Sequence, residues 1–154
     1  MSLSLGLNFT QSLALIYVVA YVSLLVQFEG LYSVNGLLPM NDFMEMVVQA
    51  RSGQEKSRWD TFWGEYPSFL LLDVTTGLPV ETLAELVLLV GLGAALWVVV
   101  CGNNVVPTLL MVMCYLAMYL AGQTFLSFQW DILLLEVGWV LVVSSLFESS
   151  GRHS

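Results

Sequence analysis

The sequence GQTFLSFQWDILLLEVGWVLVVSSLF, residues 122–147, joins two apolar segments through a short run of aromatic, amide and acidic side chains. Its first aromatic rings belong to Phe125, Phe128 and Trp130. Such amphipathic rings settle at the headgroup level of a bilayer. Asp131 and Glu136 then open and interrupt an apolar run that continues to Phe147. Because a carboxylate within a membrane segment needs a partner, this stretch predicts a membrane helix that packs against other helices.

The composition of the whole chain agrees with a membrane location. Of its 154 residues, 58% are hydrophobic and 10% are charged, and the mean hydropathy is +0.82. Ordinary soluble domains are about 45–50% apolar and about 25% charged. The net charge of -8 comes largely from acidic residues between positions 29 and 85, and it argues against nucleic acid as a partner. The predicted partner is the lipid bilayer.

The apolar runs predict four membrane helices, over residues 9–28, 83–101, 105–121 and 129–147. The first run contains no charge, and it lacks the basic residues and the cleavage site of a signal peptide, so we expect it to be retained. Thr82 and Glu85 match a capping box at the start of the second helix. Gly102-Asn103-Asn104, with Pro107 just beyond, predicts a tight hairpin between the second and third helices.

Small residues are spaced for close packing of the second and third helices. They are Gly91, Ala95, Cys114, Ala117 and Ala121. On the fourth helix, a rotation of about 100° per residue places Gln129 and Glu136 on one side, where we expect a polar seam inside the bundle. Asp131 points about 140° away from Glu136 on the same count, so the two carboxylates are not expected to form a catalytic pair.

The remaining segment, residues 29–81, is the one water-facing part of the predicted fold, a long loop with short helices at the membrane surface. Capping-box patterns begin at Asp42 and Ser57. The second pattern precedes one helical stripe of aromatics, Trp59, Phe62, Trp63 and Tyr66. Two interpretations remain open for this stripe. It packs against the membrane surface or the bundle, or it forms a docking face for a client protein.

Residues for common catalytic chemistry are few. The only histidine is His153, no Cys/His cluster has the spacing of a metal site, and no phosphate-binding loop or nucleophile elbow occurs. Cys101 and Cys114 lie in apolar segments, where we expect free thiols and not a disulfide. The sequence therefore predicts a protein that is not an enzyme and that has no cofactor and no metal.

The pattern F-x-x-F-Q-W-D-x-L-L-L-E-x-G at 125–138 closely resembles a signature of the lipase maturation factor family. Two further blocks, a glycine-rich turn at 30–39 and the apolar segment after Pro67, resemble that family in the same order. The resemblance marks as motif residues Gln123, Phe125, Phe128, Gln129, Trp130, Asp131, Glu136 and Gly138. It implies an all-α, multi-pass protein of the endoplasmic reticulum membrane that binds immature secreted lipases and assists their folding without catalysis. It also implies a lumenal loop at 29–81 and both chain ends on the opposite face.

Two alternatives stay open beside that function. Family members are several times longer and carry a large lumenal domain, which we expect to be absent here. The chain is then a truncated structural or adaptor membrane protein without client binding. A weaker alternative is a small proton-coupled transporter that uses Glu136, because desolvation raises the pKa of a buried carboxyl group.

Overall fold

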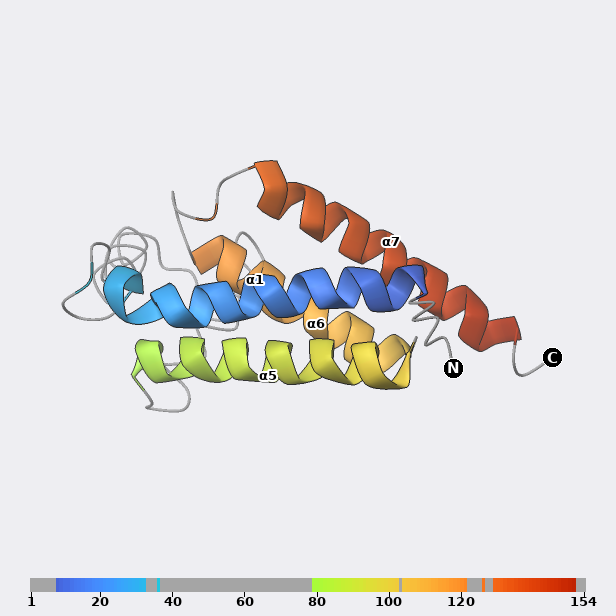
Figure 1. Ribbon diagram of the computed structural model, residues 1–154, viewed down its shortest axis with the longest axis horizontal. Helices are drawn as coiled ribbons and strands as arrows, with labels where there is room; N and C mark the ends of the chain where they lie inside the picture. The colour runs from blue at the N-terminus through green and yellow to red at the C-terminus, as the bar shows by residue number, and fades with distance from the viewer. Residues whose placement is uncertain are drawn as a thin grey trace, which may run out of the picture.

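The computed structural model describes residues 8–32, 36, 79–102, 104–121, 126 and 129–151. Its regular elements in these ranges are four α-helices (Figure 1). They are α1 (Phe9–Tyr32), α5 (Val80–Cys101), α6 (Val105–Ala121) and α7 (Gln129–Gly151). Helices α1, α5 and α7 are long and apolar enough to cross a membrane, whereas α6 is apolar but has 17 residues. The prediction of an all-helical, polytopic membrane protein is confirmed.

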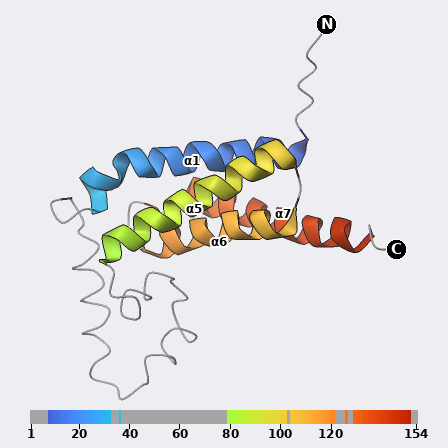
Figure 2. The same ribbon diagram turned by 90° about the horizontal axis from the view of Figure 1, so that it is seen from below.

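The helices pack as an antiparallel series in which α1 contacts α5, α5 contacts α6, and α6 contacts α7. Figures 1 and 2 show α1 and α7 reaching the same end of the bundle, α1 with its first residues and α7 with its last. At the opposite end α1 stops and α5 begins. Helix α7 leans away from the other three helices at its start (Figure 1) and touches α1 over only a short length.

The hairpin between α5 and α6 forms where the sequence predicts it. Gly102 has φ +79° and ψ -160°, a backbone conformation that is essentially restricted to glycine. Its N–H donates to the Val98 carbonyl at 2.9 Å and closes the last turn of α5. Pro107 falls in the first turn of α6, where a missing N–H costs no helical hydrogen bond. Glycine and proline therefore fix the end of one helix and the start of the next.

The predicted capping box at Thr82 is wrong. Helix α5 begins at Val80, after Pro79 in an extended conformation. The Pro79 carbonyl accepts the first helical hydrogen bond from the Leu83 N–H at 3.2 Å. Thr82 is therefore already inside the first turn and does not cap the helix. The capping patterns at Asp42 and Ser57, and the short helices predicted beside them, lie outside the described residues.

Helix α1 starts with half of a capping box that sequence reasoning missed. The Asn8 N–H donates to the Gln11 side-chain oxygen at 3.2 Å, so the third helical residue reaches back to the cap residue. The amide nitrogen of the same Gln11 donates to the Val99 carbonyl on α5 at 3.0 Å. One glutamine thus closes the start of α1 and attaches it to the end of α5.

Candidate functional site

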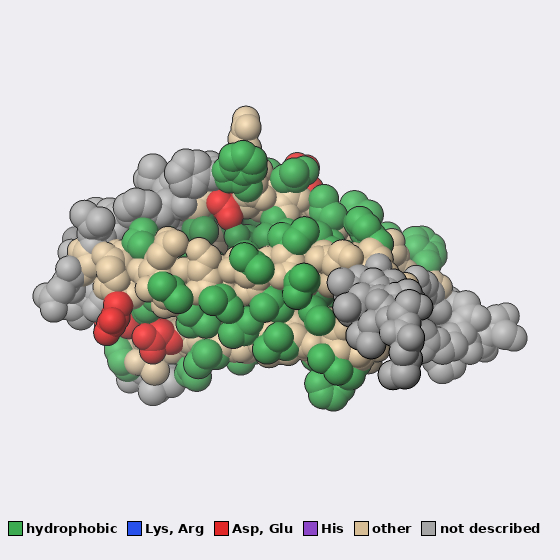
Figure 3. All heavy atoms as spheres, in the orientation of Figure 1, with side chains coloured by type: hydrophobic (Ala, Val, Ile, Leu, Met, Phe, Trp, Pro, Cys, Tyr) green, Lys and Arg blue, Asp and Glu red, His purple; other side chains and the backbone are tan. Residues whose placement is uncertain are grey.

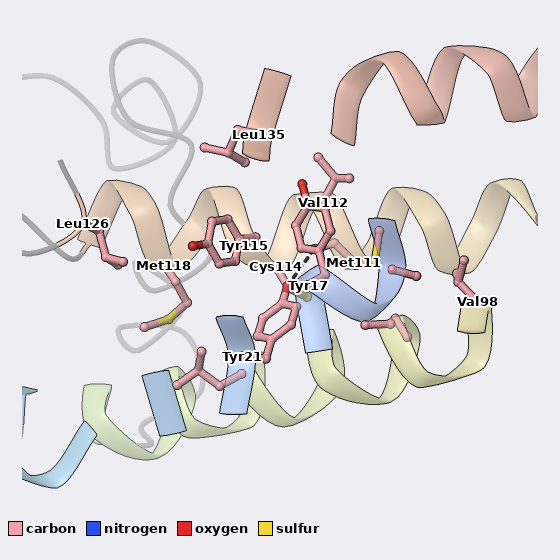
Figure 4. Packing of buried hydrophobic residues seen from close by; sticks show 14 of the residues in the cluster. Tyr17, Tyr21, Val98, Met111, Val112, Cys114, Tyr115, Met118, Leu126 and Leu135 are labelled. Atoms are coloured by element: carbon pink, nitrogen blue, oxygen red, sulfur yellow. Dashed lines mark hydrogen bonds between the residues drawn. The ribbon is translucent and has the colours of Figure 1, made fainter. Parts of the chain in front are cut away.

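Three tyrosines meet at the centre of the bundle. Tyr17 and Tyr21 lie one turn apart on α1, and both are fully buried. Tyr115 on α6 packs edge-on against both rings, with centroid distances of 5.4 Å to Tyr17 and 5.7 Å to Tyr21 (Figure 4). Edge-to-face contact at these distances is favourable beyond the area it buries. The tyrosine cluster therefore holds α1 against α6.

Two of these tyrosines also donate hydrogen bonds to the backbone of neighbouring helices. The Tyr17 hydroxyl donates to the Leu134 carbonyl of α7 at 2.8 Å. The Tyr21 hydroxyl donates to the Met111 carbonyl of α6 at 2.6 Å. A buried hydroxyl without an acceptor destabilises the fold by the full cost of its desolvation. Each tyrosine must therefore face its acceptor, which fixes the rotation of the helices about their own axes.

Each of these hydroxyls approaches a glycine of another helix. A Cβ atom added at Gly138 of α7 would collide with the Tyr17 hydroxyl and lie 2.9 Å from the Val112 side chain. A Cβ atom added at Gly91 of α5 would collide with the Tyr21 ring. Only glycine leaves room for the aromatic ring at these two crossings. These two tyrosine–glycine contacts therefore fix the packing of α1 against α5 and α7.

A third tyrosine hydrogen bond joins α6 to the start of α7. The Tyr115 hydroxyl donates to Oδ1 of Asp131 at 2.6 Å. Tyr115 is buried and Asp131 is half-buried. Asp131 thus has the partner that a carboxylate in a membrane segment requires.

A pocket of about 310 Å³ opens beside this pair. Its lining residues are Ala20, Ser23, Leu24, Gln27, Leu31, Tyr32, Tyr115, Leu126 and Asp131. The Gln27 side-chain nitrogen donates to the Ser23 hydroxyl at 3.1 Å on one side of it. The pocket joins polar groups from α1, α6 and α7 and is near the lower limit of size for a ligand site. No group of three or more His, Cys, Asp or Glu residues with metal-binding geometry occurs within the described ranges.

A family model described as the lipase maturation factor transmembrane domain matches residues 6–153. The chain belongs to the lipase maturation factor family. Similar relatives include Lipase maturation factor 2 of Xenopus laevis, 37% identical over 139 residues, and of Homo sapiens, 38% identical over 141 residues. Each match covers 88% of this chain and 18% of the relative. The chain therefore spans about a fifth of the length of these relatives. No solved structure matches it.

The structure brings two residues of the family motif into the bundle. Asp131 binds Tyr115, and Gly138 is buried beneath Tyr17. Trp130 is exposed at the start of α7, with 79% of its surface accessible, which fits a ring at the membrane interface. The motif residues Gln123, Phe125 and Phe128 lie outside the described residues, as does the predicted aromatic stripe of Trp59, Phe62, Trp63 and Tyr66.

The predicted polar seam of Gln129 and Glu136 inside the bundle is wrong. Both side chains are exposed on the outer side of α7. The buried side of α7 carries Leu135, Gly138, Leu141, Val142 and Ser145. Helix α7 is rotated this way because the glycine must lie under Tyr17. Asp131 and Glu136 point to different sides, as predicted, but the inward carboxylate is Asp131.

The tyrosine cluster is the feature that sequence reasoning missed. A signal for it exists, because Tyr17 and Tyr21 recur at the four-residue spacing of one helix face within an otherwise aliphatic run. Their acceptors are backbone carbonyls, which every residue carries, so the sequence does not identify them. Both cysteines are free thiols, Cys101 exposed and Cys114 buried, as expected.

Proposed function

We propose that this chain is a membrane-embedded helical unit of a lipase maturation factor in the endoplasmic reticulum, and that it supports the folding of secreted lipases by binding and not by catalysis. The observation that carries the proposal is the family match across residues 6–153, nearly the entire chain. The names of its relatives refer to lipase maturation.

The geometry supports a scaffold that holds its helices in one fixed arrangement. Two tyrosine–glycine contacts and the Tyr115–Asp131 hydrogen bond join all four helices of the described part. Small residues at helix crossings let the backbones approach closely in a lipid environment, where the hydrophobic effect between helices is weak. Such a bundle is suited to presenting a water-facing segment in a constant position.

The positions of the helix ends indicate which segment the bundle presents. Helix α1 ends at Tyr32 and α5 begins at Val80, at the same end of the bundle (Figure 1). We propose that residues 33–78, with the aromatic stripe at 59–66, face the lumen there and contact the immature lipase. Aromatic side chains are enriched at the energetically important positions of protein interfaces.

Co-immunoprecipitation tests binding directly. The segment of human Lipase maturation factor 2 that matches this chain is replaced by the chain, and the chimera is expressed with a pulse-labelled secreted lipase. We expect the chimera to bind newly made lipase and to release it as the lipase gains activity. Replacing Trp59, Phe62, Trp63 and Tyr66 by serine should reduce the bound fraction. Equal recovery of newly made and mature lipase would contradict the proposal.

A further inference from the structure

Glu136 is a carboxylate on the outer, apolar surface of α7. Its side chain is exposed, and so are the residues one turn before and after it, Leu133 at 58% and Val140 at 62%. Trp139 and Val143 continue the same apolar surface, with 40% and 48% of their areas exposed. The outer face of α7 is thus an apolar stripe with a single acidic group in it.

Helix geometry places Glu136 well inside the apolar part of α7. At about 1.5 Å per residue, it lies about 10 Å from Gln129 and about 16 Å from Phe147, the two ends of the apolar part of α7. A glutamate side chain does not span such a distance. A carboxyl group at this depth against lipid alone is costly, and intramembrane acidic groups almost always face other protein or a water-filled cavity.

The four helices do not supply a cation for this carboxyl group. The basic residues of the chain are Arg51, Lys56, Arg58 and Arg152, and all four lie outside the helices. Figure 3 shows hydrophobic side chains interspersed with backbone on one face of the described bundle, with a few acidic groups among them. The pocket beside Asp131 does not include Glu136 either.

We propose that the outer face of α7, residues 133, 136, 139, 140 and 143, binds a further membrane helix from the rest of a full-length lipase maturation factor. Chemical complementarity defines that helix. It is apolar where it meets Leu133 and Val140, and it carries a hydrogen-bond donor at the depth of Glu136. The relatives are long enough to contain such a helix, because about four fifths of each lies outside the match with this chain. The inference depends on family membership and not on the lipase role.

Site-directed photo-crosslinking tests the proposal in a full-length factor whose matching segment is replaced by this chain. A benzophenone amino acid is placed at Val140 on the proposed face. A matched control probe is placed at Val19 of α1, which is similarly exposed at 65%. Crosslinked peptides are identified by mass spectrometry, with and without Glu136→Leu and Glu136→Gln.

We expect the Val140 probe to react with an apolar segment of the same polypeptide that has a donor side chain within one turn of the crosslink. Glu136→Leu should lower the yield about threefold or more, the change expected on loss of one interhelical hydrogen bond. Glu136→Gln should keep most of the yield, and the Val19 products should not depend on residue 136. Reaction with lipid alone or with a second copy, or a yield unaffected by Glu136→Leu, would overturn the proposal.

The 154-residue chain alone separates loss of this contact from loss of the fold. In that chain the partner helix is absent, so Glu136→Leu removes a carboxyl group that only lipid or detergent surrounds. Its unfolding midpoint in detergent should stay the same or rise. A clear fall of the midpoint would mean that Glu136 is held within the four helices. That result would contradict the proposal that the outer face of α7 binds a further helix.

Discussion

The contact between Gly138 and Tyr17 gives the sharpest test of the described packing. Gly138→Ala places a methyl group against the Tyr17 hydroxyl and 2.9 Å from the Val112 side chain. The Tyr17 ring has no free space to rotate into, because it is fully buried and packs edge-on against Tyr115 at 5.4 Å. The substitution must therefore push α7 away from α1 or break the hydrogen bond to Leu134.

The expected loss of free energy of unfolding in Gly138→Ala combines three contributions. Overpacking a well-filled site costs about 1–3 kcal/mol, and loss of one interhelical hydrogen bond in a membrane protein adds about 0.6 kcal/mol. Alanine regains up to about 1 kcal/mol over glycine through helix propensity. The net expected loss is about 0.6–2.6 kcal/mol in the free energy of unfolding.

Gly93→Ala is the matched control, because a Cβ atom at Gly93 of α5 meets nothing within 4 Å. It should leave stability unchanged or raise it by up to about 1 kcal/mol. Both variants are unfolded in mixed detergent micelles, with helical circular dichroism as the signal. Tyr17→Phe removes the colliding oxygen, so Gly138→Ala should cost less in that background. If Gly138→Ala behaves like Gly93→Ala, the described crossing of α1 and α7 is incorrect.

Three further predictions use simple assays. Gly102→Ala should cost about 1–3 kcal/mol, because φ +79° with ψ -160° is strained for any side chain; an unchanged unfolding midpoint would contradict the hairpin geometry. Tyr115→Phe should destabilise the chain by about 1 kcal/mol and Asp131→Asn by less, since the amide oxygen still accepts the tyrosine hydrogen bond; the reverse order would contradict the Tyr115–Asp131 pair. A glycosylation sequon engineered beside Lys56 should be modified and one at the C-terminus should not, whereas modification at the C-terminus would refute the proposed lumenal loop.

The four helices of the described residues and their approximate ends could be predicted because a bilayer imposes a length on every apolar run. The break between the second and third helices at Gly102 could also be predicted. A glycine followed by two asparagines within a long uncharged run offers the backbone a way to reverse. These are local properties of the chain, and the observed helices α5 and α6 meet at this point.

The rotation of α7 could not be predicted from its pattern of apolar residues. In a soluble helix the apolar side faces the core, but in a membrane both the core and the lipid are apolar, so periodicity distinguishes the two sides poorly. The pattern placed Glu136 inside because it is polar, whereas the structure places Gly138 inside because it is small. A glycine opposite a buried tyrosine is a contact between distant parts of the sequence, and one chain does not reveal it.

Secreted lipase activity in cells that lack lipase maturation factors tests the central claim most directly. The chimeric full-length factor carrying this chain should restore secreted activity, and the same chimera with Gly138→Ala should restore less, because its bundle is loosened. The 154-residue chain alone should restore little. Failure of the chimera to restore secretion, despite normal expression and membrane insertion, would contradict the proposal that this bundle serves lipase maturation.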